Sequence, residues 1–82
     1  MNDVEYIYEV TLWKNGHIMD AYRRRSDGGE FMEYIPGEGW VQSDEAADVF
    51  NGDADFNTYS RPESDVLEAI KRWEENYKKI HE

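Results

Sequence analysis

The stretch that decides the fold is VEYIYEVTLWKNGHIMDAYRRR, residues 4–25. Apolar and polar residues alternate along residues 4–13, and β-branched and aromatic side chains are frequent, which is typical of a strand with one buried face. Asn15-Gly16 is the preferred two-residue loop of a β-hairpin, because both of its positions require a positive φ. The stretch therefore predicts two antiparallel strands, over residues 4–13 and 17–25.

A two-residue loop also fixes the register of this hairpin. Trp13 is expected opposite Ile18, and Leu12 opposite Met19. Side chains alternate between the two faces of a strand, so every second position belongs to one face. The predicted inner face consists of Val4, Tyr6, Tyr8, Val10, Leu12, Met19 and Ala21.

Two glycine-containing turns continue the sheet: SDGG at residues 26–29 and PGEG at residues 36–39. The second turn has Pro followed by Gly at its centre, which suits a type II turn. Residues 30–35 are the predicted third strand, and residues 40–42 are a candidate fourth strand. The result is an antiparallel meander of three or four strands.

The register of the later strands follows from charge and from turn length. Arg25 is expected opposite Glu30, because opposite charges across a strand pair are mildly stabilising. Val41 is expected beside Tyr34, which places Trp40 on the outer face of the sheet.

The C-terminal segment carries the pattern of an amphipathic helix over residues 61–80. Ser60-Arg61-Pro62-Glu63 fits a capping box, with Pro in the first turn. Apolar residues then recur at helical spacing, and this stripe is expected to cover the inner face of the sheet. The stripe consists of Val66, Ile70, Trp73, Tyr77 and Ile80, supported by Leu67 and Ala69.

These elements predict an α+β fold in one small domain, residues 1–82, with the C-terminal helix on one face of the sheet. A short helix over residues 44–51 is expected between sheet and long helix, capped by Ser43 and ended by Gly52. The chain has no Cys, so no disulfide supports the core. No run approaches the roughly 20 apolar residues of a membrane span. We therefore expect a cytoplasmic protein.

The predicted outer face is unusual because it mixes apolar and acidic side chains. Trp13, Tyr22, Phe31 and Trp40 are expected there among carboxylates. Residues 43–59 can fold back over this face, with Val49, Phe50, Phe56 and Tyr59 as contacts. A homodimer through the face is a second alternative, and an aromatic and acidic surface open to a different partner is a third.

Charge is distributed unevenly along the chain, whose net charge is −10. Residues 26–60 contain nine acidic residues and no Lys or Arg, although most surfaces intersperse both signs. Solubility alone is one explanation. The other is that these carboxylates face a basic surface on a partner protein, since groups arranged to bind phosphates also bind carboxylates. Direct binding to nucleic acid or to an anionic membrane is not expected at this charge.

Chemistry other than binding has little support in the sequence. His17 lies at the hairpin turn and His81 near the C-terminus, so neither has the enclosed setting of a general base, and we expect no enzyme. Asp53, Asp55 and Asn57 resemble the start of an EF-hand loop, but Thr58 and Ser64 replace the Gly and Glu that this loop requires. They are weak metal candidates, and we expect neither a metal nor a cofactor.

In size, acidity and α+β build, the chain is similar to small inhibitors encoded by phages and mobile elements, including anti-CRISPR proteins and other nucleic-acid mimics. This resemblance is one of composition and carries over no particular residues. Together with the charge pattern it implies a non-catalytic acidic protein-binding module that blocks a nucleic-acid-binding surface. The alternative is a small regulatory domain that self-associates through the outer face. The predicted partner-binding residues are Glu33, Glu38, Trp40, Asp44, Glu45, Asp48, Trp13, Tyr22 and Phe31.

Overall fold

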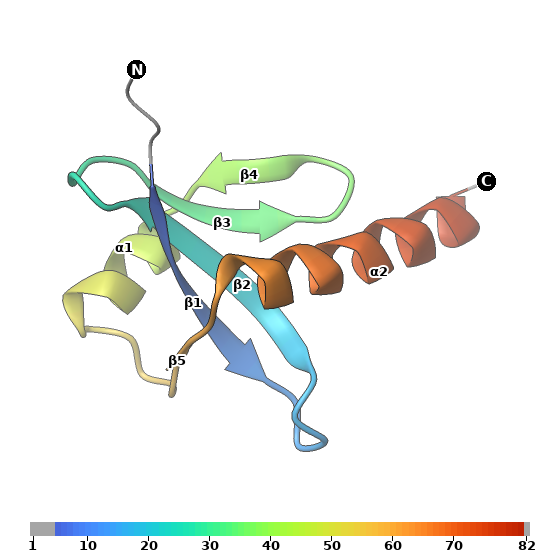
Figure 1. Ribbon diagram of the computed structural model, residues 1–82, viewed down its shortest axis with the longest axis horizontal. Coiled ribbons are helices and arrows are strands. Elements are labelled where there is room, and N and C mark those ends of the chain that lie inside the picture. The colour runs from blue at the N-terminus through green and yellow to red at the C-terminus, as the bar shows by residue number, and fades with distance from the viewer. Residues whose placement is uncertain (1–4, 82) are drawn as a thin grey trace.

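The computed structural model describes residues 5–81, in which a five-stranded antiparallel sheet lies between two helices (Figure 1). The elements are β1 (Tyr6–Leu12), β2 (Ile18–Arg25), β3 (Phe31–Ile35), β4 (Gly39–Gln42), α1 (Asp44–Asn51), β5 (Tyr59–Ser60) and α2 (Glu63–His81). The strand order is β4-β3-β2-β1-β5. The α+β class is confirmed, but the sheet has five strands rather than three or four. Val4, expected on the inner face, lies outside the described residues.

The additional strand, β5, extends the sheet beside β1. Tyr59 lies opposite Val10 and Ser60 opposite Glu9. The Thr58 hydroxyl also donates to Glu9 Oε1 at 3.0 Å, which ties the approach to β5 to the same strand. Two residues are too few to show a strand periodicity, which is why the sequence pattern did not indicate this strand.

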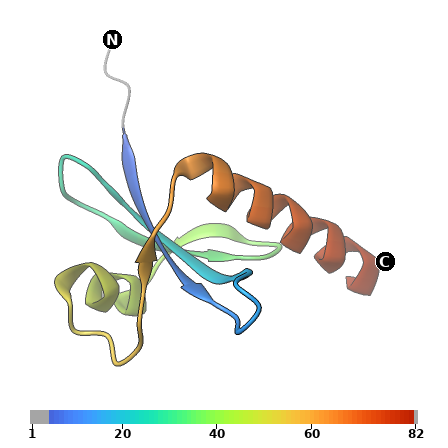
Figure 2. The same ribbon diagram turned by 60° about the horizontal axis from the view of Figure 1, so that its bottom comes forward.

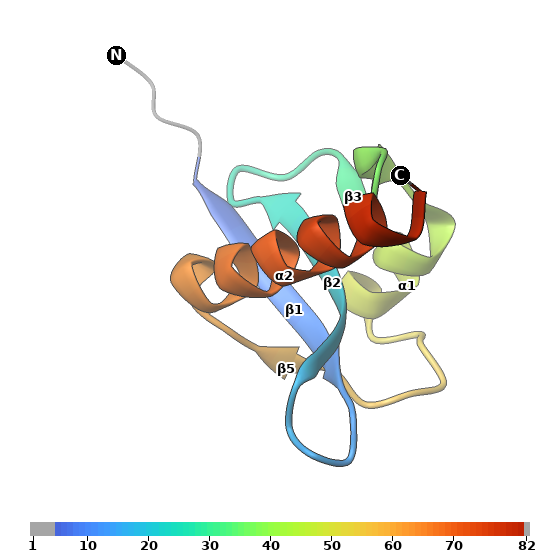
Figure 3. The same ribbon diagram turned by 90° about the vertical axis from the view of Figure 1, so that its right-hand side faces the viewer.

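Helix α2 crosses the inner face of the sheet, as its apolar stripe predicts (Figure 3). The buried core on this side consists of Tyr8, Val10 and Ala21 from the sheet and Val66 from the helix. Ile70 and Trp73 pack against this core, together with Leu12 and Ile18. The second half of α2 extends past the strands, so Tyr77 is 38% exposed and Ile80 is 77% exposed (Figure 1).

The predicted start of the long helix is wrong by two residues. Ser60 belongs to β5, and the helix begins at Glu63. The Glu63 carboxylate accepts a hydrogen bond from the Tyr8 hydroxyl at 2.7 Å. Glu63 thus holds the helix start against β1, where a capping box would have turned its carboxylate back toward Ser60.

The first hairpin differs from the prediction at its tip. The Trp13 N–H donates to the His17 carbonyl at 2.8 Å, so three residues form the loop, with Gly16 at a φ of +87°. Leu12 consequently lies opposite Ile18, and Met19 is an extra residue at a bulge. Ile18 therefore packs into the inner core, and Met19 does not pair with Leu12.

The bulge restores the predicted register for the rest of the hairpin. From Val10 opposite Ala21 to Tyr6 opposite Arg25, every pair is the predicted one. Arg23 lies opposite Met32 in the next pair of strands, also as predicted. Arg25 forms its ion pair with Asp27 of the following turn, at 3.0 Å, and not with Glu30.

The turn between β3 and β4 places Trp40 on the inner face, which corrects its predicted outer position. Glu38 N–H donates to the Ile35 carbonyl at 2.9 Å, and Ile35 lies opposite Gly39. The loop is therefore one residue shorter than predicted, and Trp40 faces Tyr34 while Val41 faces Glu33. A slip of one residue moves each side chain of a strand to the opposite face.

Helix α1 covers part of the outer face and forms a second core there (Figure 2). Tyr22 of β2 is buried against Ala46 and Val49 of α1, and the ring of Phe31 stacks on that of Phe50 with centroids 6.0 Å apart. Of the three alternatives for this face, the structure supports coverage by residues 43–59.

No helix within residues 5–81 is long and apolar enough to cross a membrane.

Candidate protein-binding surface

The nine residues predicted to bind a partner do not form one continuous surface. Trp40 lies on the inner face against Tyr8 and Tyr34, with ring centroids 5.9 and 5.3 Å away. Tyr22 is 1% exposed and therefore cannot act as a surface anchor. Glu38 is exposed in the β3–β4 turn, at the end of β4 that is remote from α1.

Helix α1 carries three of the predicted acidic residues on its exposed surface. Ser43 caps the helix by accepting the Ala46 N–H at 3.2 Å, and Asp44 and Glu45 occupy the first turn. Negative charge is favourable at a helix N-terminus, so these carboxylates also support the helix. Asp44, Glu45 and Asp48 are exposed, and the last turn of α1 carries no basic residue.

Three carboxylates from different elements act on the hydroxyl group of Tyr22 through their negative charge. Tyr22 Oη donates to Glu45 Oε2 at 3.2 Å. Burial raises the pKa of Tyr22 well above its usual value, and the negative charges of Asp20, Glu45 and Glu33 raise it further. Tyr22 is consequently a neutral hydrogen-bond donor that links β2 to α1.

Glu33 is partly buried at the junction between β3 and α1. Burial raises its pKa, and the charges of Glu45 and Asp20 act in the same direction. The Ser43 hydroxyl opposes the shift by donating to Glu33 Oε1 at 3.0 Å. Glu33 thus anchors the start of α1 and is less available to a partner than the exposed acids of the helix.

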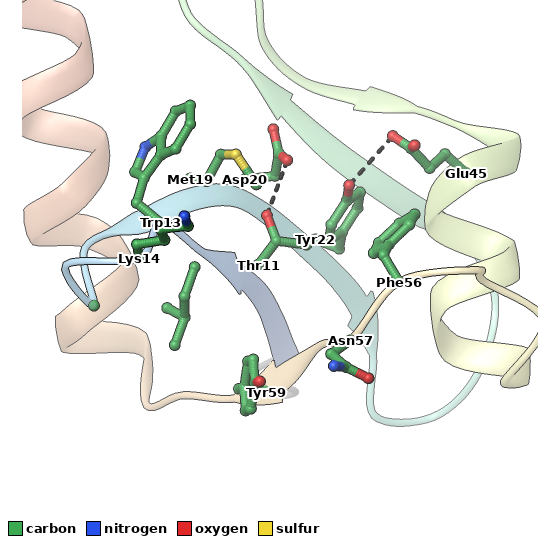
Figure 4. Close-up of a pocket in the computed structure, with 12 residues that line it drawn as sticks. Thr11, Trp13, Lys14, Met19, Asp20, Tyr22, Glu45, Phe56, Asn57 and Tyr59 are labelled. Carbon is green, nitrogen blue, oxygen red and sulfur yellow. Dashed lines mark hydrogen bonds between the residues drawn. The ribbon is translucent and has the colours of Figure 1, made fainter.

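A hollow of about 650 Å³ opens beside Trp13, between the tip of the first hairpin and the segment that precedes β5 (Figure 4). We call it the Trp13 groove. Its apolar lining consists of Leu12, Trp13, Met19, Tyr22, Phe56 and Tyr59, and its polar lining of Thr11, Lys14, Gly16, Asp20, Glu45 and Asn57.

The sequence indicated part of this groove. Trp13, Tyr22 and Glu45 were predicted binding residues, whereas Asp20 and Met19 were not. Phe56 was expected as a cover for the outer face, and its ring does stack on that of Tyr22 with centroids 6.3 Å apart, although it remains 39% exposed. Tyr59, expected in the same role, is 43% exposed. The place of Tyr59 in the lining of the groove depends on β5, and the two-residue strand left no pattern from which it could be predicted.

The segment that resembles the start of an EF-hand loop begins at Asp53, directly after the C-terminal cap of α1 at Gly52. Gly52 has a φ of +79°, and the Asp53 N–H donates to the Asp48 carbonyl at 2.8 Å. Asp55 and Asn57 are exposed beyond this cap. Across residues 5–81, no three or more His, Asp or Glu side chains are grouped so that they could hold a metal ion. Of the three candidate ligands, Asp53 therefore belongs to the C-terminal cap of α1.

The chain was compared with protein-family models, with curated proteins and with solved structures, and none of the three comparisons found a match.

Proposed function

We propose that this protein is a non-catalytic binding module whose acidic surface occupies a basic, nucleic-acid-binding surface of a partner protein. The observation that carries the proposal is the exposed acidic face of α1, with Asp44, Glu45 and Asp48, within a segment that has no Lys or Arg from residue 26 to residue 60.

Charge complementarity supplies the physical basis of the proposal. Arg and Lys side chains that bind phosphates also form charge-assisted hydrogen bonds with carboxylates, so an acidic helix can compete for the same site. The net charge of −10 steers the protein toward basic surfaces and speeds encounter at low salt. The same charge opposes direct binding to nucleic acid, whose affinity depends on neutralising phosphates.

The surroundings of the histidines support a non-catalytic role. His17 is exposed at the tip of the first hairpin, and His81 is exposed at the last residue of α2. A general base needs a supported position within reach of a bound substrate. Neither imidazole has such a position, and Tyr22 is buried and held neutral by its surroundings.

Self-association through the outer face of the sheet is the alternative proposal. Only the part of that face that α1 leaves uncovered is available for it. Helix α1 covers Tyr22 and Phe31, but Trp13 is 58% exposed and Ile7 is 37% exposed. Sedimentation equilibrium separates the alternatives. A dimer that dissociates in Trp13→Ala supports self-association, and a monomer at high concentration contradicts it.

Capture from a host lysate tests the main proposal if two variants of equal charge are compared. Asp44→Asn/Asp48→Asn removes two negative charges from α1, and Glu68→Gln/Glu75→Gln removes two exposed charges from α2. We expect the wild type and the α2 variant to retain the same protein, and the α1 variant to lose it. The retained protein should be released by moderate salt and displaced by duplex DNA or RNA.

Two results contradict the proposal. The first is capture that the α1 variant reduces no more than the α2 variant does, since net charge alone would then explain binding. The second is a captured protein that nucleic acid does not displace, since the acidic face would then not occupy a phosphate-binding surface.

A further inference from the structure

We propose that the Trp13 groove receives an arginine side chain of the partner protein. This inference rests on the proposed function, because it names the chemical group of the basic partner that the surface receives. Three features carry it: the size of the groove, its exposed aromatic walls and the two carboxylates in its lining.

The walls of the groove suit a flat apolar or delocalised group. Trp13 is 58% exposed, although a large apolar side chain is usually covered. In Figure 4, Trp13 and Met19 lie on one side of the hollow, and Tyr59 lies on the other. Exposed aromatic side chains that line a hollow are typical anchors of protein interfaces.

Two elements contribute negative charge to the lining of the groove. Asp20 comes from β2 and accepts a hydrogen bond from the Thr11 hydroxyl at 2.9 Å. Glu45 comes from α1 and accepts the Tyr22 hydroxyl at 3.2 Å. Each bond engages one oxygen and fixes the carboxylate, while an ionised carboxylate can accept several more hydrogen bonds. The raised pKa of Tyr22 agrees with this negative surrounding.

Lys14 also lines the groove, at the exposed tip of the first hairpin. It is one positive charge against the two carboxylates of Asp20 and Glu45, and its flexible stem can leave the groove toward water. The groove therefore favours a cation over an anion.

Arginine fits this combination better than lysine does. The guanidinium group is flat and weakly hydrated, so it can stack on an aromatic ring such as that of Trp13 while it donates two parallel hydrogen bonds to a carboxylate. Its apolar stem can lie along Met19 and Leu12. A lysine ammonium is a compact, strongly hydrated charge and gains less from aromatic walls.

The test uses three blocked tripeptides, Gly-Arg-Gly, Gly-citrulline-Gly and Gly-Lys-Gly, titrated into the full chain and followed by ¹H–¹⁵N NMR. Citrulline keeps the shape of arginine but has no charge. We expect the arginine peptide to shift the indole N–H of Trp13 and the side-chain amide of Asn57 in a saturable way. Citrulline and lysine peptides should bind at least about tenfold more weakly.

Variants assign the binding to the groove. Trp13→Ala, read at Asn57, and Asp20→Asn, read at Trp13, should each weaken arginine binding severalfold. Asp20→Asn keeps an oxygen that can accept from Thr11, so the fold is preserved. Leu67→Ala removes a comparably exposed apolar side chain, and Glu75→Gln removes an exposed acid on α2; both should bind as the wild type does.

The inference is overturned if citrulline or lysine binds as well as arginine, or if Trp13→Ala and Asp20→Asn leave binding unchanged. Its failure is distinguishable from failure of the proposed function. Capture that depends on Asp44 and Asp48 without an arginine-dependent shift at Trp13 removes the inference alone. An arginine-dependent shift without such capture removes the proposed function alone.

Discussion

The guanidinium carbon of Arg23 lies 4.4 Å from the centre of the Trp40 ring, on the face of the sheet that α2 covers. The ring of Tyr6 contacts the same group at 4.0 Å. Arg23 Nε is buried without a hydrogen-bond partner in the part of the chain that the structure describes. Stacking on two rings therefore contributes to holding this cation in place.

Replacing Arg23 with Lys tests the stacking, because Lys keeps the charge but lacks the flat group. We expect Arg23→Lys to lower the free energy of unfolding by about 1 kcal/mol in urea titrations. Arg72→Lys, on the exposed side of α2, should change it by less than about 0.5 kcal/mol. Equal effects of the two substitutions would show that the rings contribute little.

Gly37 lies in close contact with the ring of Tyr77. A Cβ at Gly37 would clash with the Tyr77 ring, and φ is +85°; Gly16 has φ +87° and open space. Both alanine variants should lose about 1–2 kcal/mol from the backbone, and Gly37→Ala up to about 1 kcal/mol more, because the end of the exposed Tyr77 side chain must move aside. Thermal and urea unfolding measure both.

The variant Tyr77→Ala, which lacks the ring, separates the backbone contribution to the lost stability from the contribution of the clash. In Tyr77→Ala, the additional Gly37→Ala substitution should cost no more than Gly16→Ala does in the wild type. If the extra cost persists without the ring, the clash with Tyr77 is not its source.

Ser43 holds the start of α1 through two hydrogen bonds, one from the Ala46 N–H and one to Glu33. We expect Ser43→Ala to lower stability by about 1 kcal/mol, as the loss of an N-cap usually does. Hydrogen exchange should become faster at the Ala46 and Ala47 amides. Ser64→Ala in α2 is the control and should leave α1 exchange unchanged.

Glu33 should make stability depend on pH in a predictable direction. Its pKa is raised by burial and by nearby carboxylates, so the folded state binds more protons than the unfolded state between the two pKa values. Stability therefore falls as pH rises from the unfolded-state pKa, about 4.3, through the raised folded-state pKa.

The variant Glu33→Gln removes this dependence and keeps an oxygen for the Ser43 hydroxyl. At pH 7 it should be more stable than the wild type by less than about 1 kcal/mol, because partial exposure screens the charge. The difference should diminish as pH falls from the raised folded-state pKa toward 4.3, and it should be absent below about 4.3. Urea titrations from pH 3.5 to 7 measure it, and a difference that does not vary with pH would contradict the assignment.

The sequence predicted those parts of the fold that depend on long-range periodicity. The α2 stripe from Val66 to Trp73 packs where the pattern indicated, and the register from Val10–Ala21 outward is correct because alternation over many residues leaves one solution. Strand β5 was missed because two residues carry no periodicity.

Errors in the candidate site came from turns. Trp40 was assigned to the wrong face because the β3–β4 loop has three residues rather than four, and this difference does not appear in composition. Tyr22 was predicted as an exposed anchor, whereas α1 buries it. Turn length and the path of a short helix depend on tertiary packing, which local patterns do not encode.

The three-residue loop shifts the strand register of the first hairpin by one residue at its tip, and the bulge at Met19 reverses this shift. The conformation of the hairpin tip therefore does not change the pairing of the residues beyond the bulge. We therefore expect that the tip can be changed by substitution, for example at Trp13, Lys14 or Met19, or by altering the length of the loop. The strand register beyond the pair Thr11–Asp20 should remain the same. The tip is thus a natural place at which to engineer the specificity of the groove on an unchanged scaffold.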